Sequence, residues 1–298
     1  MKLNNNVLHI KGIIMNHTSD HIITTAEKSF FRRHFFHPHS ILKYLTRSWV
    51  LVTLSGQWIF ALYIFITFGI PALSGSPTSA DTSKMIQGYV NGDEFGNGVL
   101  MIHLLPAILL SFGGIFQLLP YLRKKYPAVH RWNGRMFLTL GLFGAITGLY
   151  LTWVRGSRLS DIGSIGLTIN GLLILLSVTL AWKFAINRQY QNHMRWAIHA
   201  FILINGVWTF RLYLMGWYML NQGENGNTAT IDGPADITIS FASYLFPMLV
   251  AEVYFWAKRQ NTAYRVSIAN LFMLFGLLIT IIGEVSATLF MWWPRIGS

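Results

Sequence analysis

The chain has 298 residues, of which 53% are hydrophobic and only 11% are charged. Soluble domains carry about a quarter charged residues, so this composition excludes an ordinary soluble protein. We interpret the formal charge of +12 as the topogenic Lys and Arg of a membrane protein, not as a nucleic-acid surface. The absence of cysteine excludes disulfides, thiolate metal sites and iron–sulfur clusters.

A polar segment, residues 1–47, precedes the first apolar window. It carries six of the ten histidines. Within it, residues 30–38 (FFRRHFFHP) mix aromatic side chains with arginines, as in segments that lie along a membrane surface. We predict a cytoplasmic tail with an interfacial segment. We interpret its histidines as part of a flexible basic tail in preference to a metal site.

Seven apolar windows follow, each about 20 residues long, which is the length that a helix needs to cross the hydrocarbon core. They run over residues 49–69, 99–119, 136–154, 162–186, 196–218, 237–257 and 268–292. Because backbone polar groups in lipid must be satisfied within the segment, each window is predicted to be a helix. Residues 48–298 are therefore predicted to form an all-α polytopic membrane bundle of seven transmembrane helices.

Lys and Arg are distributed unevenly between the two sides of this bundle. If the N-terminus defines side one, 18 of the 23 fall on that side, and the opposite side holds only Lys84, Arg155, Arg158 and Arg295. Cytoplasmic loops carry the excess of Lys and Arg in membrane proteins. We therefore predict a cytoplasmic N-terminus and an external C-terminus.

Ionisable residues inside spans mark candidate sites, because charge is costly in hydrocarbon. His103, Arg211 and Glu284 fall in the outer half of the predicted spans. We expect an outer polar layer in which an Arg211–Glu284 pair lowers the cost of both charges, with His103 beside it. Two interpretations stay open: a structural ion pair that locks two helices, and a ligand-binding role.

A second polar layer is predicted at the cytoplasmic end of the spans. Its members are Gln117, His130, Arg131, Arg135, His193, Arg195 and His199, with Glu252 at a similar depth. Residues eighteen apart share a helix face, so we expect His193, Trp196 and Arg211 on one face of the fifth span. That face would join the two layers along one seam, which makes Trp196 a ligand-binding candidate together with His103, Gln117, Arg211 and Glu284.

The cytoplasmic histidines are open to several interpretations. A b-type haem needs two imidazoles on different helices and cations near its propionates. His130 with His193 or His199 would supply the imidazoles, and Arg131 and Arg135 the cations. A zinc site lacks the i, i+3 or i, i+4 histidine spacing of helical sites, so no metal site is predicted. The remaining interpretation places these histidines in the headgroup zone, bound to backbone carbonyls or phosphates.

Two pieces of the sequence together resemble a known family. The first holds His103, Gln117, Leu122-Arg123, Pro127 and His130-Arg131-x-x-Gly134-Arg135, and the second holds His193-x-x-Trp196 followed by Arg211. Over about residues 95–215 the chain resembles the bacterial predicted membrane proteins called domain of unknown function 2306. The resemblance implies a bacterial inner membrane and the same candidate residues, but no activity. In that family an arginine often stands at the position of His199, which favours His130 and His193 as the ligand pair.

The sequence thus predicts an integral inner-membrane protein that binds a cofactor or a small anionic or lipid ligand within its helix bundle. The most specific version is a single-haem electron-transfer protein with a redox partner. The alternatives are a non-redox transporter whose Arg211 holds an anionic group, and a structural or accessory subunit. Membrane lipid and a small molecule are the expected partners, and nucleic acid is not. The residues do not decide whether the protein is an enzyme.

Overall fold

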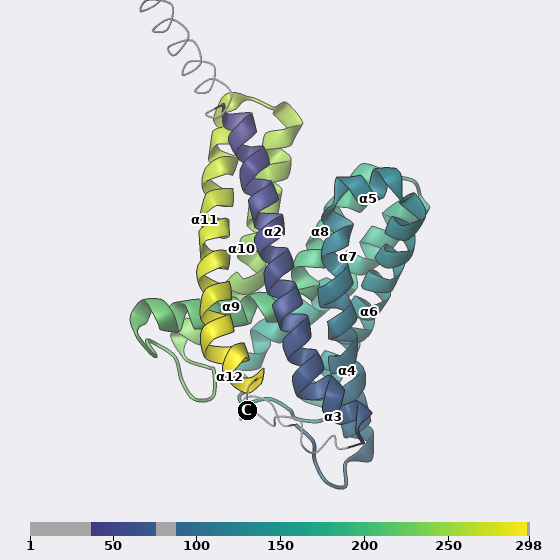
Figure 1. Ribbon diagram of the computed structural model, residues 1–298, viewed down its shortest axis with the longest axis vertical. Helices are drawn as coiled ribbons and strands as arrows, with labels where there is room; N and C mark the ends of the chain where they lie inside the picture. The colour runs from purple at the N-terminus through teal and green to yellow at the C-terminus, as the bar shows by residue number, and fades with distance from the viewer. Residues whose placement is uncertain (1–36, 76–87, 297–298) are drawn as a thin grey trace, which may run out of the picture.

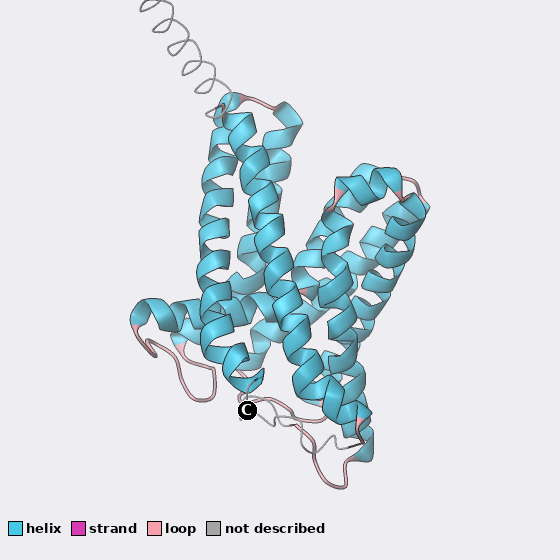
Figure 2. Ribbon diagram, in the orientation of Figure 1, coloured by secondary structure: helices cyan, strands magenta, loops and turns pink. Residues whose placement is uncertain are grey.

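A computed structural model describes residues 37–75 and 88–296. The regular structure of these residues is entirely helical (Figure 2). Among the described residues six helices are long and apolar enough to cross a membrane, and there are seven spans if the bent pair Tyr190–Ile204 and Gly206–Asn221 is counted as one. The prediction of an all-α polytopic membrane bundle is confirmed. The predicted interfacial segment of the tail lies almost wholly outside the described residues.

The elements follow the predicted spans closely. They are α2 (Pro38–Ile64) continued by a π-helical turn into α3 (Ile70–Leu73), α4 (Glu94–Gly113) continued by the 3₁₀ turn Gly114–Leu118, α5 (Pro120–Lys125), α6 (Pro127–Trp153), α7 (Gly163–Ile186), α8 (Tyr190–Ile204), α9 (Gly206–Asn221), α10 (Pro234–Gln260), α11 (Ala263–Ala287) and, after a further π-helical turn, α12 (Trp293–Ile296). Proline stands at the first position of α2, α5, α6 and α10, where its missing N–H costs nothing.

The helices form two groups that diverge towards one end of the molecule (Figure 1). In one group α11 packs against α2 and α10, and in the other α6 and α7 pack against α4 and α8. Contacts of α2 with α4, of α10 with α7, and of α9 with α11 and α10 hold the groups together. We call the diverging end the basic end. The starts of α2, α6, α8 and α11, the ends of α7 and α10, and α5 all lie there, and together with their connections they carry 13 of the 17 described Lys and Arg.

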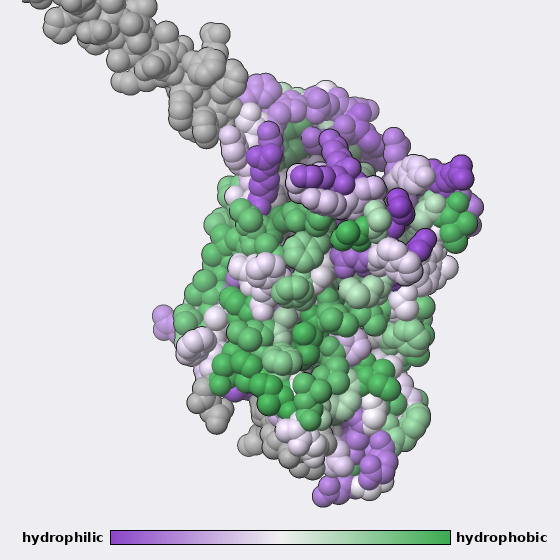
Figure 3. Space-filling model, turned by 45° about the vertical axis from the view of Figure 1, so that its right-hand side comes forward, coloured by the Kyte–Doolittle hydropathy of each residue, from purple (hydrophilic) through white to green (hydrophobic). Residues whose placement is uncertain are grey.

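The outer surface matches a membrane. Figure 3 shows a broad hydrophobic zone between two hydrophilic ends. Large apolar side chains such as Leu51, Phe143, Leu172, Leu249 and Leu271 are exposed along the long helices. Exposed apolar patches of this extent are unfavourable in water and favourable in lipid. The protein is therefore embedded in a membrane and contacts lipid along these helices.

The fifth span is broken at Asn205, where α8 and α9 meet at 54°. Two side-chain amides donate hydrogen bonds to carbonyls in the last turn of α8. Asn205 Nδ2 donates to Phe201 O at 2.8 Å, and Asn170 Nδ2 of α7 donates to Leu203 O at 3.1 Å. Gly206 lets α7 approach, since a Cβ there would lie 2.9 Å from the Asn170 amide nitrogen. The expectation of one straight helix is wrong. Leu203 O is bonded by the Asn170 amide of another helix, Phe201 O accepts both the backbone and the side-chain N–H of Asn205, and the predicted seam along the helix face is interrupted.

The helices α9 and α11 approach each other through glycine. A Cβ added to Gly283 would lie 2.6 Å from Leu212 O and 2.7 Å from Leu212 Cβ, both parts of α9 that cannot rotate away. Gly144 on α6 is a contrasting case, since nothing lies within 4 Å of a Cβ placed there. Small residues at helix interfaces are the usual way for membrane helices to pack closely.

We predict that Gly283→Ala lowers the free energy of unfolding by about 1–3 kcal/mol, because α9 must move away from α11. Gly144→Ala is the matched control, and its better helix propensity should leave stability unchanged or raise it by up to about 1 kcal/mol. Thermal unfolding of the detergent-purified proteins measures both. Equal melting temperatures for the two variants would contradict the close contact.

Candidate functional site

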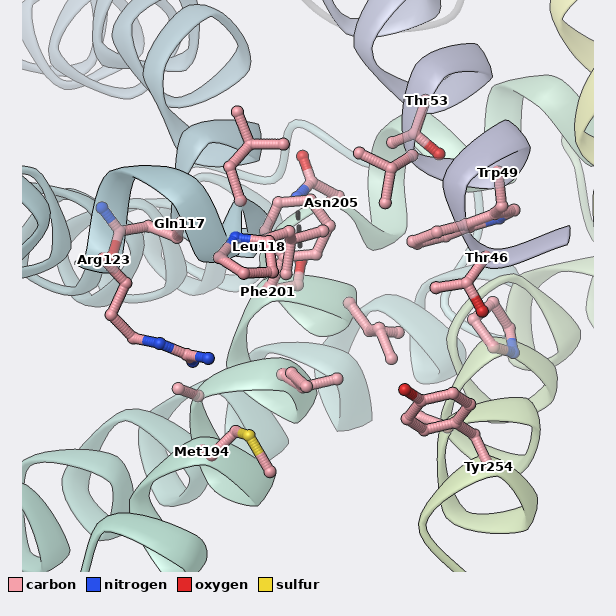
Figure 4. A pocket seen from close by; sticks show the side chains of 18 of the residues that line it. Thr46, Trp49, Thr53, Gln117, Leu118, Arg123, Met194, Phe201, Asn205 and Tyr254 are labelled. Carbon is pink, nitrogen blue, oxygen red and sulfur yellow. Dashed lines mark hydrogen bonds between the residues drawn. The ribbon is translucent and has the colours of Figure 1, made fainter. Parts of the chain in front are cut away.

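A cleft of about 2120 Å³ lies between the two groups of helices, on the side of the basic end. Its walls come from α2, α10 and α11 on one side and from α5, α6, α7 and α8 on the other. In Figure 4, Thr46, Trp49 and Thr53 of α2 face Gln117 and Arg123 across the space. Small-molecule pockets have about 300–1,000 Å³, so this cleft has room for a long chain.

The walls of the cleft are mainly apolar. Leu42, Phe137 and Phe201 are buried core residues that line it, and Val50 and Phe246 add partly buried surface. Such walls favour a hydrocarbon chain, since each apolar Å² removed from water is worth about 25 cal/mol. A strongly polar solute would lose its hydration there without replacement.

Six cations line the cleft, and no Asp or Glu is among its lining residues. They are Lys43, Arg47, Arg123, Arg131, Arg135 and Lys258, and we call them the basic rim. Figure 4 shows the guanidinium of Arg123 reaching into the space. Among the described residues no carboxylate pairs with any of them. One-signed charge above low-dielectric walls attracts counter-ions, so the rim favours an anionic group.

At the end of the molecule opposite the basic end, two arginines are paired with carboxylates. Arg155 Nε donates to Asp93 Oδ2 at 2.8 Å, and its Nη2 reaches Asn97 Oδ1 and Gly88 O. The hydrogen bond from Arg155 lowers the pKa of Asp93 below its usual range. Arg158 likewise pairs with Asp161. These arginines hold loops in place. Of the rim cations, Arg135 lies over the Trp132 ring and Lys258 over the Tyr254 ring, but within the described residues none has a carboxylate partner.

Five members of the predicted cytoplasmic layer line this cleft. They are Gln117, His130, Arg131, Arg135 and His193. Gln117 Nε2 donates to His130 O at 3.2 Å, which ties the end of the second span to the start of α6. His193 Nδ1 lies 2.9 Å from Ala181 O and must donate, because a carbonyl only accepts. This bond leaves the Nε2 lone pair of His193 free to bind a ligand.

Three other members of that layer form a separate cluster between α8 and α10. Arg195 donates two hydrogen bonds of 2.6 Å to the carboxylate of Glu252, and His199 Nε2 lies 2.7 Å from the same group. His199 is 5% exposed and does not line the cleft. Trp196 does not line it either: its ring packs 5.8 Å from that of His199, beside the main core. Neither residue is placed to touch a ligand in the cleft.

The expected Arg211–Glu284 pair is not formed. Arg211 Nη1 donates to Val207 O of its own helix at 3.1 Å, and its guanidinium lies 5.6 Å from the centre of the Phe60 ring of α2. Glu284 Oε1 accepts a 2.9 Å bond from Ser55. The pair was expected from depth along straight helices, but the break reorients α9. The guanidinium contacts an aromatic face instead of a carboxylate.

His103 also has its own partner outside the cleft. Its Nδ1 lies 2.9 Å from Thr147 Oγ1 of α6, which fastens α4 to α6. A Cβ on Gly148 would lie 3.2 Å from the His103 ring, so the glycine makes room for the imidazole. The predicted outer layer is therefore three separate contacts, not one site.

Comparison with protein families gives one clear result. A family described as predicted membrane protein (DUF2306) matches residues 100–255. The chain belongs to this family. The match covers just over half of the chain and extends beyond the stretch in which the sequence itself suggested the resemblance. No curated protein and no solved structure matches.

The family match includes much of the cleft of this DUF2306 protein but leaves out α2 and α11. Three polar residues near the break were not named as site candidates from the sequence. Thr53 of α2 and Trp208 of α9 line the cleft, and Gln57 Nε2 of α2 donates to Asn205 Oδ1 at 2.9 Å. Two signals in the sequence point to this region. One is Gln57, an uncharged amide in the middle of the first apolar span, and the other is the turn-favouring pair Asn205-Gly206 within the fifth.

Proposed function

We propose that this DUF2306 protein binds an amphiphile with an anionic head group. The head pairs with the basic rim, and the apolar chain lies between the two groups of helices. A single observation carries the proposal: one large apolar cleft has six cations and no carboxylate among its lining residues. Fatty acids and anionic phospholipids share the required chemistry.

The alternatives account less well for these features. A purely structural subunit does not need a cleft of about 2120 Å³ in its centre. A transporter for small polar anions needs polar groups along the path, whereas the walls here are mainly apolar. The six rim cations are exposed, and no carboxylate of the described residues pairs with them, so they are accessible to an anionic head group.

We also propose that the basic end faces the cytoplasm of a bacterial inner membrane. Support comes from the positive-inside rule, because 13 of the 17 Lys and Arg among the described residues belong to segments of that end. Anionic lipid in the inner leaflet attracts such segments by about 1 kcal/mol per cation.

This orientation predicts the behaviour of fused reporters. A reporter that is active only in the cytoplasm should be active within residues 120–135 and silent after Ser298. Both fusions must be shown to be expressed by immunoblot. The reverse pattern would place the basic rim outside and contradict the proposal.

The ligand prediction uses a charge-matched pair of double variants. Arg123→Gln with Arg131→Gln removes two rim cations, while Lys124→Gln with Lys125→Gln removes two cations from the same segment outside the cleft. At about 1 kcal/mol per cation, the first should raise the Kd for dodecanoate about 30-fold, and the second should change it little. Binding of labelled dodecanoate is measured in phosphatidylcholine nanodiscs, with neutral dodecanol as the uncharged comparison.

One further result would identify the source of the ligand, and two would contradict the rim site. Competition by phosphatidate added to the nanodiscs identifies a membrane lipid as a ligand, and its absence favours a free amphiphile. Equal effects of the two double variants would show that only bulk charge matters and would contradict a rim site. Equal affinity for dodecanol and dodecanoate would also contradict a rim site, because it would show that the anionic group adds nothing to binding.

Haem is a second candidate, because it too joins an apolar body to anionic groups. The observation that favours it is the hydrogen bond from His193 to Ala181 O, the arrangement that commonly orients a ligating imidazole. His130 lines the same cleft, and Arg131 and Arg135 stand near it for the propionates. Bound haem would supply one-electron chemistry. His199 is already bonded to Glu252 and does not belong to this set.

If haem is bound, protein purified from haem-supplied cells should show a Soret band that shifts on reduction. His130→Ala or His193→Ala should abolish the band, because two axial imidazoles are needed. His199→Ala should retain it. A colourless wild-type protein would remove this candidate and leave the amphiphile proposal standing.

A further inference from the structure

The floor of the cleft holds polar atoms without protein partners. Thr53 is 1% exposed and Trp208 is 5% exposed, and both line the cleft. Neither Thr53 Oγ1 nor Trp208 Nε1 has a hydrogen-bond partner within the described residues. Buried polar atoms are normally paired, so each exception requires an explanation.

Three of the four other threonines that line the cleft have a hydroxyl bonded within their own helix. In helices a threonine hydroxyl commonly bonds back to a carbonyl one turn earlier. Thr46 donates to Leu42 O at 2.7 Å, Thr209 to Asn205 O at 3.1 Å and Thr280 to Gly276 O at 2.8 Å. Thr53 makes no such bond.

The position of these atoms is also informative. Trp208 is the third residue of α9, directly after the break at Asn205, and Thr53 lies one turn from Gln57, which bonds to Asn205. Breaks within transmembrane helices commonly adjoin the binding sites of membrane proteins. The floor therefore combines a helix break with two unpaired polar side chains from different helices.

We infer that the floor binds a second, uncharged oxygen of the ligand, a hydroxyl or a carbonyl. Trp208 Nε1 can only donate, so the ligand must present an acceptor, and Thr53 Oγ1 can donate or accept. The inference rests on the proposed function of the cleft. Along α2, a rise of about 1.5 Å per residue puts Thr53 about 9 Å from the level of Arg47 and about 15 Å from that of Lys43. The ligand thus has an anionic head, an apolar segment of about that length, and then an oxygen.

The test compares dodecanoate with 12-hydroxydodecanoate, which differ only in a hydroxyl at the far end of the chain. Wild-type protein in phosphatidylcholine nanodiscs should bind the hydroxy acid about tenfold more tightly, the size expected for one or two added hydrogen bonds. Trp208→Phe and Thr53→Val remove the polar atoms at nearly constant shape, and each should reduce the ratio of the two Kd values. The matched control Thr46→Val should keep the ratio, because the Thr46 hydroxyl is already bonded to its own helix. Trp153→Phe should keep it too, because that indole lies outside the cleft and donates to Thr168.

The possible outcomes separate this inference from the proposed function. Equal affinity of the wild type for both acids overturns the inference and leaves the anionic site standing. Failure to bind either acid overturns both. A ratio that survives Trp208→Phe and Thr53→Val removes these two residues as the floor contacts. If Trp208→Phe does not fold, the ratio of the two Kd values in the wild type and in Thr53→Val still tests the inference.

Discussion

In hydrocarbon every backbone polar group needs a partner, and this requirement governs the break at Asn205. A helix can stop in mid-membrane only where side chains take over the bonds that the next turn would have made. Asn170 does so for Leu203 O, Asn205 adds a side-chain bond to Phe201 O, and Gln57 holds the Asn205 amide from α2. One set of amide contacts thus joins α2, α7 and α8 at the point where the chain turns.

The cleft follows from that turn. After the break α9 packs against α11 and α10 rather than continuing along α7, with Gly283 allowing close contact. The two groups of helices are held together near the break and diverge towards the basic end (Figure 1). The basic rim stands above the cleft because α2, α5, α6 and α10 bring their cationic segments to the same end.

The sequence predicts some of these features for clear physical reasons. Span length and hydrophobicity are local properties, so the helices and the cationic end follow from composition alone. The grouping of Gln117, His130 and His193 also follows, because each lies at the same end of its span. The Arg211–Glu284 pair failed because it depended on the direction of a helix after a bend. That bend is fixed by Gln57 and Asn170, which are distant in sequence and polar without charge.

In the proposed site the rim and the floor impose complementary demands on one ligand. A rim alone would accept any anionic amphiphile, since ion pairing at a wet surface discriminates weakly between chains. The floor adds selectivity of another kind, because an apolar chain end would leave Thr53 Oγ1 and Trp208 Nε1 without partners, and unpaired buried atoms weaken binding more than an extra contact strengthens it. A molecule that satisfies both ends also stabilises the fold, because ligand bound at 100 times its Kd adds about 2.7 kcal/mol to the free energy of unfolding. Since that molecule contacts both groups of helices at once, its binding opposes their separation about the break at Asn205.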